Sequence, residues 1–300
     1  MPKLGIAVFG AGGFGRFHVR EIIKAGCPVL AILGRTKDSV RNTAANIERD
    51  YGVKVRPYWD LQEILKNREI GAVSVCTPPE LHWEHVARSL EASLHVICEK
   101  PFLRPMPGGY YGLASELFEL ADKKGKVLTV NTQLPALIEQ LPPLEEIPKE
   151  IKIEMESGSS SMILEDMLPH ALSLIIQMTS PNGRIKNLKF QERDKIRICF
   201  SYCYPNGESY IDCEIGFNPL RPRKLAFSYG AEYFQRIFTR ETEQVLVSPS
   251  GKTYEVKDPL EVSISRFVNC AEGSGKPLVS REEILTNVRL YADLLVAFTR

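Results

Sequence analysis

The start of the chain is the feature that most limits its fold. An apolar run, Leu4 to Phe9, leads into the turn Gly10-Ala11-Gly12-Gly13-Phe14-Gly15, and a helix-like segment, Arg16 to Lys24, follows. A strand, a G-x-G-x-x-G turn and a helix in this order form a site for a pyrophosphate, because the glycines let the backbone turn and approach the phosphates while the helix N-terminus offers free N–H groups. The segment predicts a Rossmann dinucleotide site, the alternative being an ordinary glycine-rich turn.

Strand-like and helix-like segments alternate over the first 130 residues. Strands are expected at 4–9, 28–33, 53–56, 71–76, 94–98 and 126–131, and helices at 14–25, 38–50, 60–67, 82–92 and 109–124. Such alternation indicates parallel strands joined by right-handed crossovers. The fold class predicted for this part is α/β, a doubly wound Rossmann sheet.

From about residue 150 the pattern changes to consecutive strands. They are expected at 151–156, 185–190, 196–204, 209–217, 224–229, 233–238, 244–248 and 253–256. Turn signals such as Pro205-Asn206-Gly207 separate several of them, which predicts a largely antiparallel open sheet. Helices are expected at 165–178 and 281–298, and the proline-rich segment 134–148 should be an irregular connection.

Two domains follow from this change of pattern. We expect a dinucleotide-binding Rossmann domain over residues 1–131 and an α+β substrate and oligomerisation domain over 132–300, with the closing helix free to pack back on the first domain. The long open sheet should leave one face for self-association, so a homodimer or homotetramer through the second-domain sheet is expected.

The composition of the chain limits the classes of partner that it is expected to bind. The chain has 38 basic and 37 acidic residues, a net charge of +1 and no basic tract, which argues against nucleic acid or an anionic membrane and favours a small-molecule substrate. No apolar run approaches the roughly 20 residues that cross a bilayer, and no signal-peptide pattern opens the chain, so a cytoplasmic protein is expected. The seven cysteines include no C-x-x-C pair, so neither a zinc site nor a disulfide framework is predicted.

The residues after the second strand indicate which dinucleotide binds. They are Gly34-Arg35-Thr36-Lys37, at the place where an acidic side chain usually accepts hydrogen bonds from a bare ribose. Arg35 can bind a 2′-phosphate with two hydrogen bonds, and Thr36 and Lys37 add a hydroxyl and a point charge. This favours NADP over NAD, unless Arg35 stacks on the adenine or is merely solvated.

Two further strand ends carry recognisable motifs. Thr77 and Pro78 follow the strand 71–76, with His82 opening the next helix, and Glu99-Lys100-Pro101 follows the strand 94–98. The chain also contains Asp166 and His170 in D-x-x-x-H spacing and the closing pattern Phe267, Gly275, Pro277 and Ser280. Together with the glycine turn, these motifs resemble those of the Gfo/Idh/MocA family of NAD(P)-dependent oxidoreductases. The family is named after glucose-fructose oxidoreductase and inositol dehydrogenase.

The resemblance implies roles for several of these residues. Thr77 and Pro78 would border the cofactor, Glu99 would touch the nicotinamide ribose, and Lys100 would lie near both cofactor and substrate. It also allows a cis Lys100-Pro101 peptide. His82 becomes a candidate for substrate contact.

Asp166 and His170 also make chemical sense as a pair. Residues four apart on one helix face the same way, so a carboxylate and an imidazole can meet one substrate or each other. The family uses such a pair for proton transfer, and histidine is suited because its ordinary pKa lies near 6.5. The alternative is that Asp166 caps a helix beginning near Met167 and that His170 is a packing residue.

The expected function is therefore NADP-dependent hydride transfer to or from a carbonyl, alcohol or imine carbon of a small polar metabolite, with Lys100 and His170 as acid/base groups. An imine or linear-tetrapyrrole reductase is a close variant. A catalytically silent NADP(H) sensor that acts through a protein partner is the alternative from another class.

Three departures from the family pattern bear on the substrate. A serine-rich segment, 157–162, stands where a glycine-rich one is common; Ala171-Leu172-Ser173 offers no second acid; and Asn131-Thr132-Gln133 lacks a following arginine. The substrate is therefore expected to differ from an ordinary sugar or polyol.

Overall fold

The computed structural model describes residues 3–104, 110–240 and 243–298. The chain divides into two units. The first comprises Met1–Asn131 and Leu260–Arg281, and the second comprises Thr132–Pro259 and Glu282–Arg300.

Among the described residues, six strands form the sheet of the first unit. They are β1 (Ile6–Phe9), β2 (Val29–Leu33), β3 (Arg56–Tyr58), β4 (Ala72–Val75), β5 (His95–Glu99) and β6 (Leu128–Asn131). Their order is β3-β2-β1-β4-β5-β6, and every neighbouring pair is parallel. The predicted doubly wound sheet is confirmed, and its order reverses between β1 and β4, where a ligand binds in sheets of this kind.

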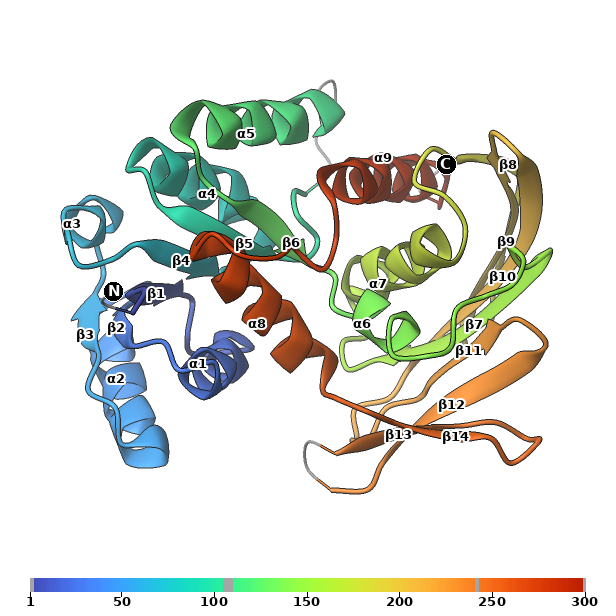
Figure 1. The fold of residues 1–300 in the computed structure, drawn as a ribbon, viewed down its shortest axis with the longest axis horizontal. Helices are drawn as coiled ribbons and strands as arrows, with labels where there is room; N and C mark the ends of the chain where they lie inside the picture. The colour runs from blue at the N-terminus through green and yellow to red at the C-terminus, as the bar shows by residue number, and fades with distance from the viewer. Residues whose placement is uncertain (1–2, 105–109, 241–242, 299–300) are drawn as a thin grey trace. The chain divides into compact units, whose positions relative to one another are not determined.

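Helices cover both faces of this sheet (Figure 1). They are α1 (Gly15–Lys24), α2 (Lys37–Tyr51), α3 (Leu61–Leu65), the 3₁₀ turn η1 (Pro79–Leu81), α4 (His82–Glu91), α5 (Tyr110–Lys124) and α8 (Pro259–Ala271). Val19 and Ile22 of α1 join Val40 and Ile47 of α2 in one buried apolar cluster on the sheet, which explains why both helices lie on the same face.

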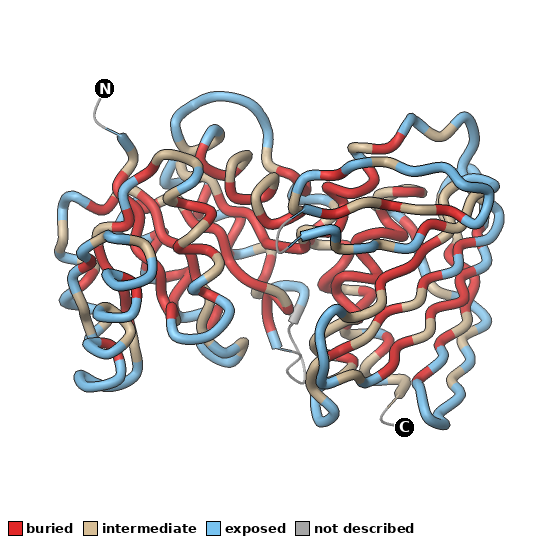
Figure 2. The backbone as a smooth tube through the Cα atoms, turned by 90° about the horizontal axis from the view of Figure 1, so that it is seen from below, coloured by how far each residue is buried: buried red, intermediate tan, exposed pale blue. Residues whose placement is uncertain are grey.

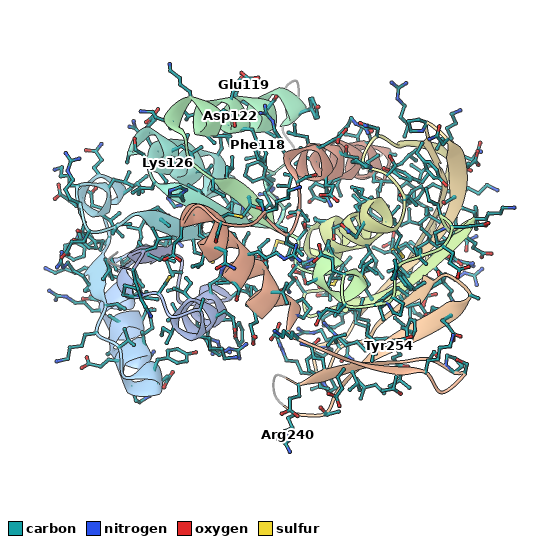
Figure 3. The ribbon with its side chains drawn as sticks, in the orientation of Figure 1. Phe118, Glu119, Asp122, Lys126, Arg240 and Tyr254 are labelled. Atoms are coloured by element: carbon teal, nitrogen blue, oxygen red, sulfur yellow. The ribbon has the colours of Figure 1, made fainter. Side chains whose placement is uncertain are left out.

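The helix α8 was not predicted from the sequence, and residues 132–300 were expected to form one continuous domain. Instead, the chain returns to the first unit at Leu260, because Ile264 and Phe267 complete the apolar cluster that α1 and α2 begin. The segment that follows is held on α5, where Asp122 and Phe118 lie (Figure 3). Arg281 donates to Asp122 at 2.7 Å, and its guanidinium lies 5.4 Å from the centre of the Phe118 ring.

In the described part of the second unit, eight strands form one sheet. They are β7 (Glu150–Ser157), β8 (Arg184–Glu192), β9 (Ile196–Tyr204), β10 (Gly207–Phe217), β11 (Leu225–Tyr229), β12 (Glu232–Phe238), β13 (Gln244–Val247) and β14 (Thr253–Val256). Their order is β14-β13-β12-β11-β7-β10-β9-β8. The pair β7 and β10 is parallel and the other neighbours are antiparallel, which confirms a largely antiparallel sheet.

One face of this sheet is covered by α7 (Ile163–Met178), which packs on β7 and β10. Buried residues alternate with more exposed ones along these strands (Figure 2). On β10, for example, Ile211, Cys213 and Ile215 are buried whereas Tyr210 is exposed. The unit also contains the short helix α6 (Pro135–Ile138), inside the connection expected to be irregular, and α9 (Arg281–Phe298). Over the ranges described, no helix has the length and apolar character to cross a membrane.

Candidate functional site

The glycine turn joins β1 to α1 at the reversal point of the first sheet. Gly10 has a φ of +83°, and a Cβ there would lie 2.6 Å from the carbonyl oxygen of Cys76. A Cβ at Gly15 would lie 2.6 Å from the carbonyl oxygen of Gly10. Both positions therefore require glycine, because the turn passes directly against the end of β4. This contact brings the turn together with Thr77.

The middle of the same turn is open. A Cβ at Gly12 would meet only Thr43 Oγ1, at 3.6 Å, and one at Gly13 would meet nothing within 4 Å. Both glycines and Phe14 are exposed, and no hydrogen bond among the described residues uses the N–H of Gly12 or Gly13. Open backbone N–H groups just before a helix N-terminus fit the diphosphate of a dinucleotide.

Two alanine substitutions separate the fold of this turn from its binding. We expect Gly10→Ala to lower the free energy of unfolding by about 1–3 kcal/mol, because its backbone is left-handed and its Cβ would clash. Gly12→Ala should change the free energy of unfolding by less than about 0.5 kcal/mol yet weaken the binding of a nicotinamide dinucleotide about tenfold, since the methyl group occupies phosphate space. Urea unfolding and calorimetric titration measure the two effects. Unchanged dinucleotide affinity in Gly12→Ala would contradict a diphosphate site at this turn.

The three residues after β2 have different surroundings. Arg35 is exposed and makes no ion pair with the described chain. Thr36 caps α2: its hydroxyl oxygen accepts from the N–H of Ser39 at 3.3 Å, in a reciprocal capping box. Lys37 places its ammonium 5.2 Å from the centre of the Trp59 ring. The hydroxyl that was assigned to phosphate binding therefore already has a structural task.

A buried polar network lies at the ends of β4, β5 and β6. Nδ1 of His18 is 2.8 Å from Ser74 Oγ, and Nε2 is 2.8 Å from Glu99 Oε1. Asn131 Nδ2 donates to the same Oε1 at 2.5 Å. Glu99 Oε2 accepts no hydrogen bond from the described residues, and Asn131 Oδ1 is buried without a partner among them. The network thus fixes one oxygen of Glu99 and leaves the other for a ligand.

The two charged members of this network stabilise each other. Burial lowers the pKa of His18, but its contacts with Cys76 and Glu99 outweigh burial and raise the pKa to about 10. Burial raises the pKa of Glu99, but the hydrogen bonds from His18 and Asn131 and the charge of Lys100 outweigh it, so the pKa is lowered. At neutral pH the pair is therefore an imidazolium and a carboxylate.

His82 links the segments that follow β4 and β5. It is fully buried, with Nε2 2.8 Å from the carbonyl oxygen of Thr77 and Nδ1 2.9 Å from that of Pro101. Its contacts thus hold the residues beside Lys100, which is half-buried, and the Lys100-Pro101 peptide is cis. Since both ring nitrogens face backbone carbonyls, His82 positions this segment instead of meeting a substrate. The Thr77 hydroxyl lies 3.0 Å from Nδ1 of His85, and Pro78 is exposed.

The second unit carries Asp166 and His170 on the first turns of α7. The helix begins at Ile163, so Asp166 lies inside it and is not its cap. Asp166 Oδ2 accepts a hydrogen bond from Ser157 Oγ at 2.8 Å, and His170 is 7% exposed. The serine-rich segment 157–162 thus places a hydroxyl on this carboxylate. Asn287 donates to the carbonyl oxygen of Pro169 at 2.8 Å and fixes the helix between the two residues.

His18 does not stand out in the sequence, and no sequence pattern connects Asn131 with Glu99. The available signal was the row of polar residues Ser74, Glu99 and Asn131 in or at the ends of three otherwise apolar strands. Trp59, an exposed aromatic residue directly after β3, was also not predicted from the sequence to be part of the site.

Parts of this chain are similar to known proteins. Residues 4–132 match the family model described as "Oxidoreductase family, NAD-binding Rossmann fold". An uncharacterised oxidoreductase of Schizosaccharomyces pombe is 43% identical over 76 residues, 25% of this chain and 19% of that protein. Inositol 2-dehydrogenase of Paracoccus denitrificans is 30% identical over 127 residues, 42% of this chain and 35% of that protein. The chain therefore matches only about a fifth to a third of the length of these relatives.

Solved structures extend the likeness to the second unit. UDP-N-acetylglucosamine 3-dehydrogenase from Acidithiobacillus ferrooxidans covers 99% of this chain and 98% of its own, with a TM-score of 0.77 and 17% identity, which shows a shared fold. The glycine turn, the Glu99-Lys100-Pro101 run and the six strands of the first sheet all lie within residues 4–132. Residues 4–132 are therefore similar to the NAD-binding Rossmann domain of the Gfo/Idh/MocA oxidoreductases.

Proposed function

We propose that the protein is an NADP-dependent oxidoreductase that moves a hydride between the nicotinamide and a carbonyl, alcohol or imine carbon of a small polar metabolite. The observation that carries the cofactor assignment is Arg35, an exposed guanidinium without an ion pair in the described chain, at the strand end where a bare ribose would need an acid. The open N–H groups of Gly12 and Gly13 would hold the diphosphate.

Nucleotide binding tests this assignment directly. NADPH should bind more tightly than NADH, and Arg35→Ala should remove the difference, because a charged hydrogen bond to phosphate contributes about 1.5–3 kcal/mol, roughly 10- to 100-fold in affinity. Arg41→Ala is the matched control, since Arg41 is an exposed arginine further along α2. Equal affinities in the wild type would contradict the NADP assignment.

Glu99 and Asn131 would serve the other end of the cofactor. Glu99 Oε2 is the unused oxygen of a carboxylate whose other oxygen is fixed by His18 and Asn131, so it can accept from a ribose hydroxyl. The buried Oδ1 of Asn131 offers a second acceptor. When bound, the nicotinamide would supply or accept the hydride.

Lys100 and His170 are proposed as the acid/base groups. An ammonium at Lys100 would polarise the substrate oxygen or nitrogen, and His170 would take or return the proton that accompanies hydride transfer. Asp166, four residues before His170 and hydrogen-bonded by Ser157, would orient the imidazole or contact the substrate. The missing acid after His170 and the missing cation after Asn131 favour a substrate with fewer hydroxyl groups than a sugar or polyol, including an imine.

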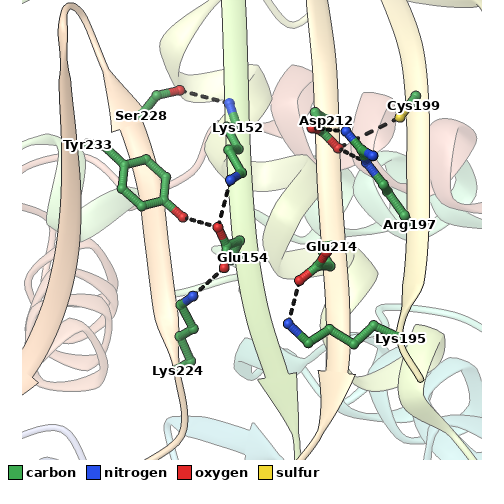
Figure 4. Close-up of polar contacts among 10 residues, drawn as sticks. All are labelled: Lys152, Glu154, Lys195, Arg197, Cys199, Asp212, Glu214, Lys224, Ser228 and Tyr233. Carbon is green, nitrogen blue, oxygen red and sulfur yellow. Dashed lines mark hydrogen bonds and ion pairs between the residues drawn. The ribbon is translucent and has the colours of Figure 1, made fainter. Parts of the chain in front are cut away.

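Self-association through the solvent face of the second sheet completes the proposal. That face carries charges of both signs in adjacent pairs on β7 and β10 and on or directly before β9 and β11 (Figure 4). The pairs are Lys152 with Glu154, Lys224 with Glu154, Arg197 with Asp212, and Lys195 with Glu214. A surface that alternates both signs is complementary to a second copy of itself about a two-fold axis, and not to a polyanion.

The mass in solution tests this surface. Sedimentation equilibrium should give a dimer or tetramer, and Tyr210→Glu should shift it toward monomer, because Tyr210 is 47% exposed on β10 beside Asp212. Leu220→Glu changes a more exposed residue outside the strands and should leave the mass unchanged. A monomeric wild type, or equal masses for Tyr210→Glu and wild type, would contradict the surface.

A further inference from the structure

An exposed tryptophan lies beside the residues that follow β2. Trp59 comes directly after β3 and is 48% exposed. The N–H of Gly34 donates to the carbonyl oxygen of Tyr58 at 2.9 Å, so the segments leaving β2 and β3 are joined at the carboxyl edge of the sheet. Trp59 is therefore a neighbour of the loop that carries Arg35.

The indole ring already has a cationic partner. Lys37 Nζ lies 5.2 Å from the centre of the Trp59 ring, within the range of a cation–π contact. The backbone on either side is fixed: Thr36 is the N-cap of α2, and Asp60 is the N-cap of α3, where its carboxylate accepts from the N–H of Gln62 at 2.7 Å. Two capped helices thus hold the lysine and the tryptophan against each other.

This contact matters for a lysine more than for an arginine. The ammonium of Lys37 ends a flexible stem of four carbons, whereas the planar guanidinium of Arg35 is already organised for phosphate. Resting the ammonium on an indole face removes part of its rotational freedom before a ligand arrives. A bare ribose gains nothing from a cation at this edge, but a dianionic 2′-phosphate does.

We propose that Trp59 is a positioning residue that strengthens discrimination for a 2′-phosphorylated adenosine by holding the Lys37 ammonium beside Arg35. The inference rests on the proposed function, since it deepens the NADP assignment of the same site. It gives the exposed indole a role that packing does not, because nearly half of its surface remains in solvent.

The chain contains two tryptophans, so Trp83→Phe makes Trp59 the only indole fluorophore. In this variant, adenosine 2′,5′-bisphosphate should change the Trp59 emission, saturating at the calorimetric Kd, whereas adenosine 5′-monophosphate should not. Measured by calorimetry, Trp59→Leu should weaken the bisphosphate about two- to fivefold and leave the monophosphate unchanged. Trp59→Phe, which keeps an aromatic face, should restore most of the loss, and in Lys37→Ala the Trp59→Leu change should have no further effect.

Other outcomes separate the two proposals. If Trp59→Leu weakens both nucleotides equally, Trp59 contacts the adenine and the inference is overturned. If the bisphosphate binds the wild type and Trp59→Leu equally well, and its binding does not change the Trp59 emission, the inference is overturned while the NADP assignment stands. If neither the bisphosphate nor NADPH binds the wild type, the proposed function itself fails.

Discussion

Glu99→Gln should lower the free energy of unfolding by about 3–5 kcal/mol at pH 7, because it leaves the buried imidazolium of His18 without its counter-charge. The substitution preserves the shape of the side chain, so the loss of charge is the main change. Urea unfolding followed by tryptophan emission reports on this unit, since both Trp59 and Trp83 belong to it.

The matched control is Glu91→Gln. Glu91 pairs with Arg88 on the exposed surface of α4, at 3.1 Å, and the same chemical change there should alter stability by less than about 1 kcal/mol. Equal effects of the two substitutions would mean that the His18–Glu99 pair carries no special stabilisation.

The pH dependence of stability provides a second measure of the pair. The folded pKa of His18 is raised, so its contribution is fully present below the ordinary value of 6.5 and is lost as pH rises toward about 10. The folded pKa of Glu99 is lowered, so its contribution is present above the ordinary value and is lost as pH falls through the folded one. The wild type should therefore lose more stability between pH 7 and pH 10 than a His18→Gln/Glu99→Gln double variant. Identical slopes would contradict a charged pair.

The first unit could be predicted in detail because its signals are local. An apolar run, a glycine turn and a helical pattern each occupy a few consecutive residues, and right-handed crossovers then leave little choice of sheet. The helix α8 had a local signal too: Leu260, Ile264, Phe267 and Val268 are spaced for one helical face. Its return to the first unit could not be predicted, since that depends on which apolar cluster it completes.

The site residues that could be predicted are those that directly follow a single strand. Arg35 and Glu99 stand out because charged residues follow apolar strands. The His18–Glu99 contact joins residues 81 positions apart, and Glu99 meets Asn131 across another 32, so no local pattern contains the network. The role of Thr36 as the N-cap of α2 could have been predicted, because Thr36 directly precedes a helical segment and Ser39 follows three residues later. Its hydroxyl was instead assigned to phosphate binding.

The largest effect on activity is expected at His170 and Lys100. Once a screen that follows the absorbance of the reduced nicotinamide identifies a substrate, His170→Ala and Lys100→Ala should each reduce kcat by about 10²- to 10⁴-fold, the usual contribution of a positioned acid or base. NADPH affinity should remain within about threefold in His170→Ala, because acid/base groups act on the reacting atoms and not on the phosphates.

His170 is buried on α7, so a second variant guards against simple unfolding. His170→Gln keeps much of the volume and a hydrogen-bonding side chain but cannot carry the proton, and it should fold normally, bind NADPH and remain inactive. Lys124→Ala, a lysine that donates to a backbone carbonyl on the surface, is the control for Lys100→Ala and should retain full activity. Full activity in His170→Gln and Lys100→Ala would mean that neither residue acts as an acid or base. Tight NADPH binding by the wild type with no turnover of any substrate would favour the silent sensor over the enzyme.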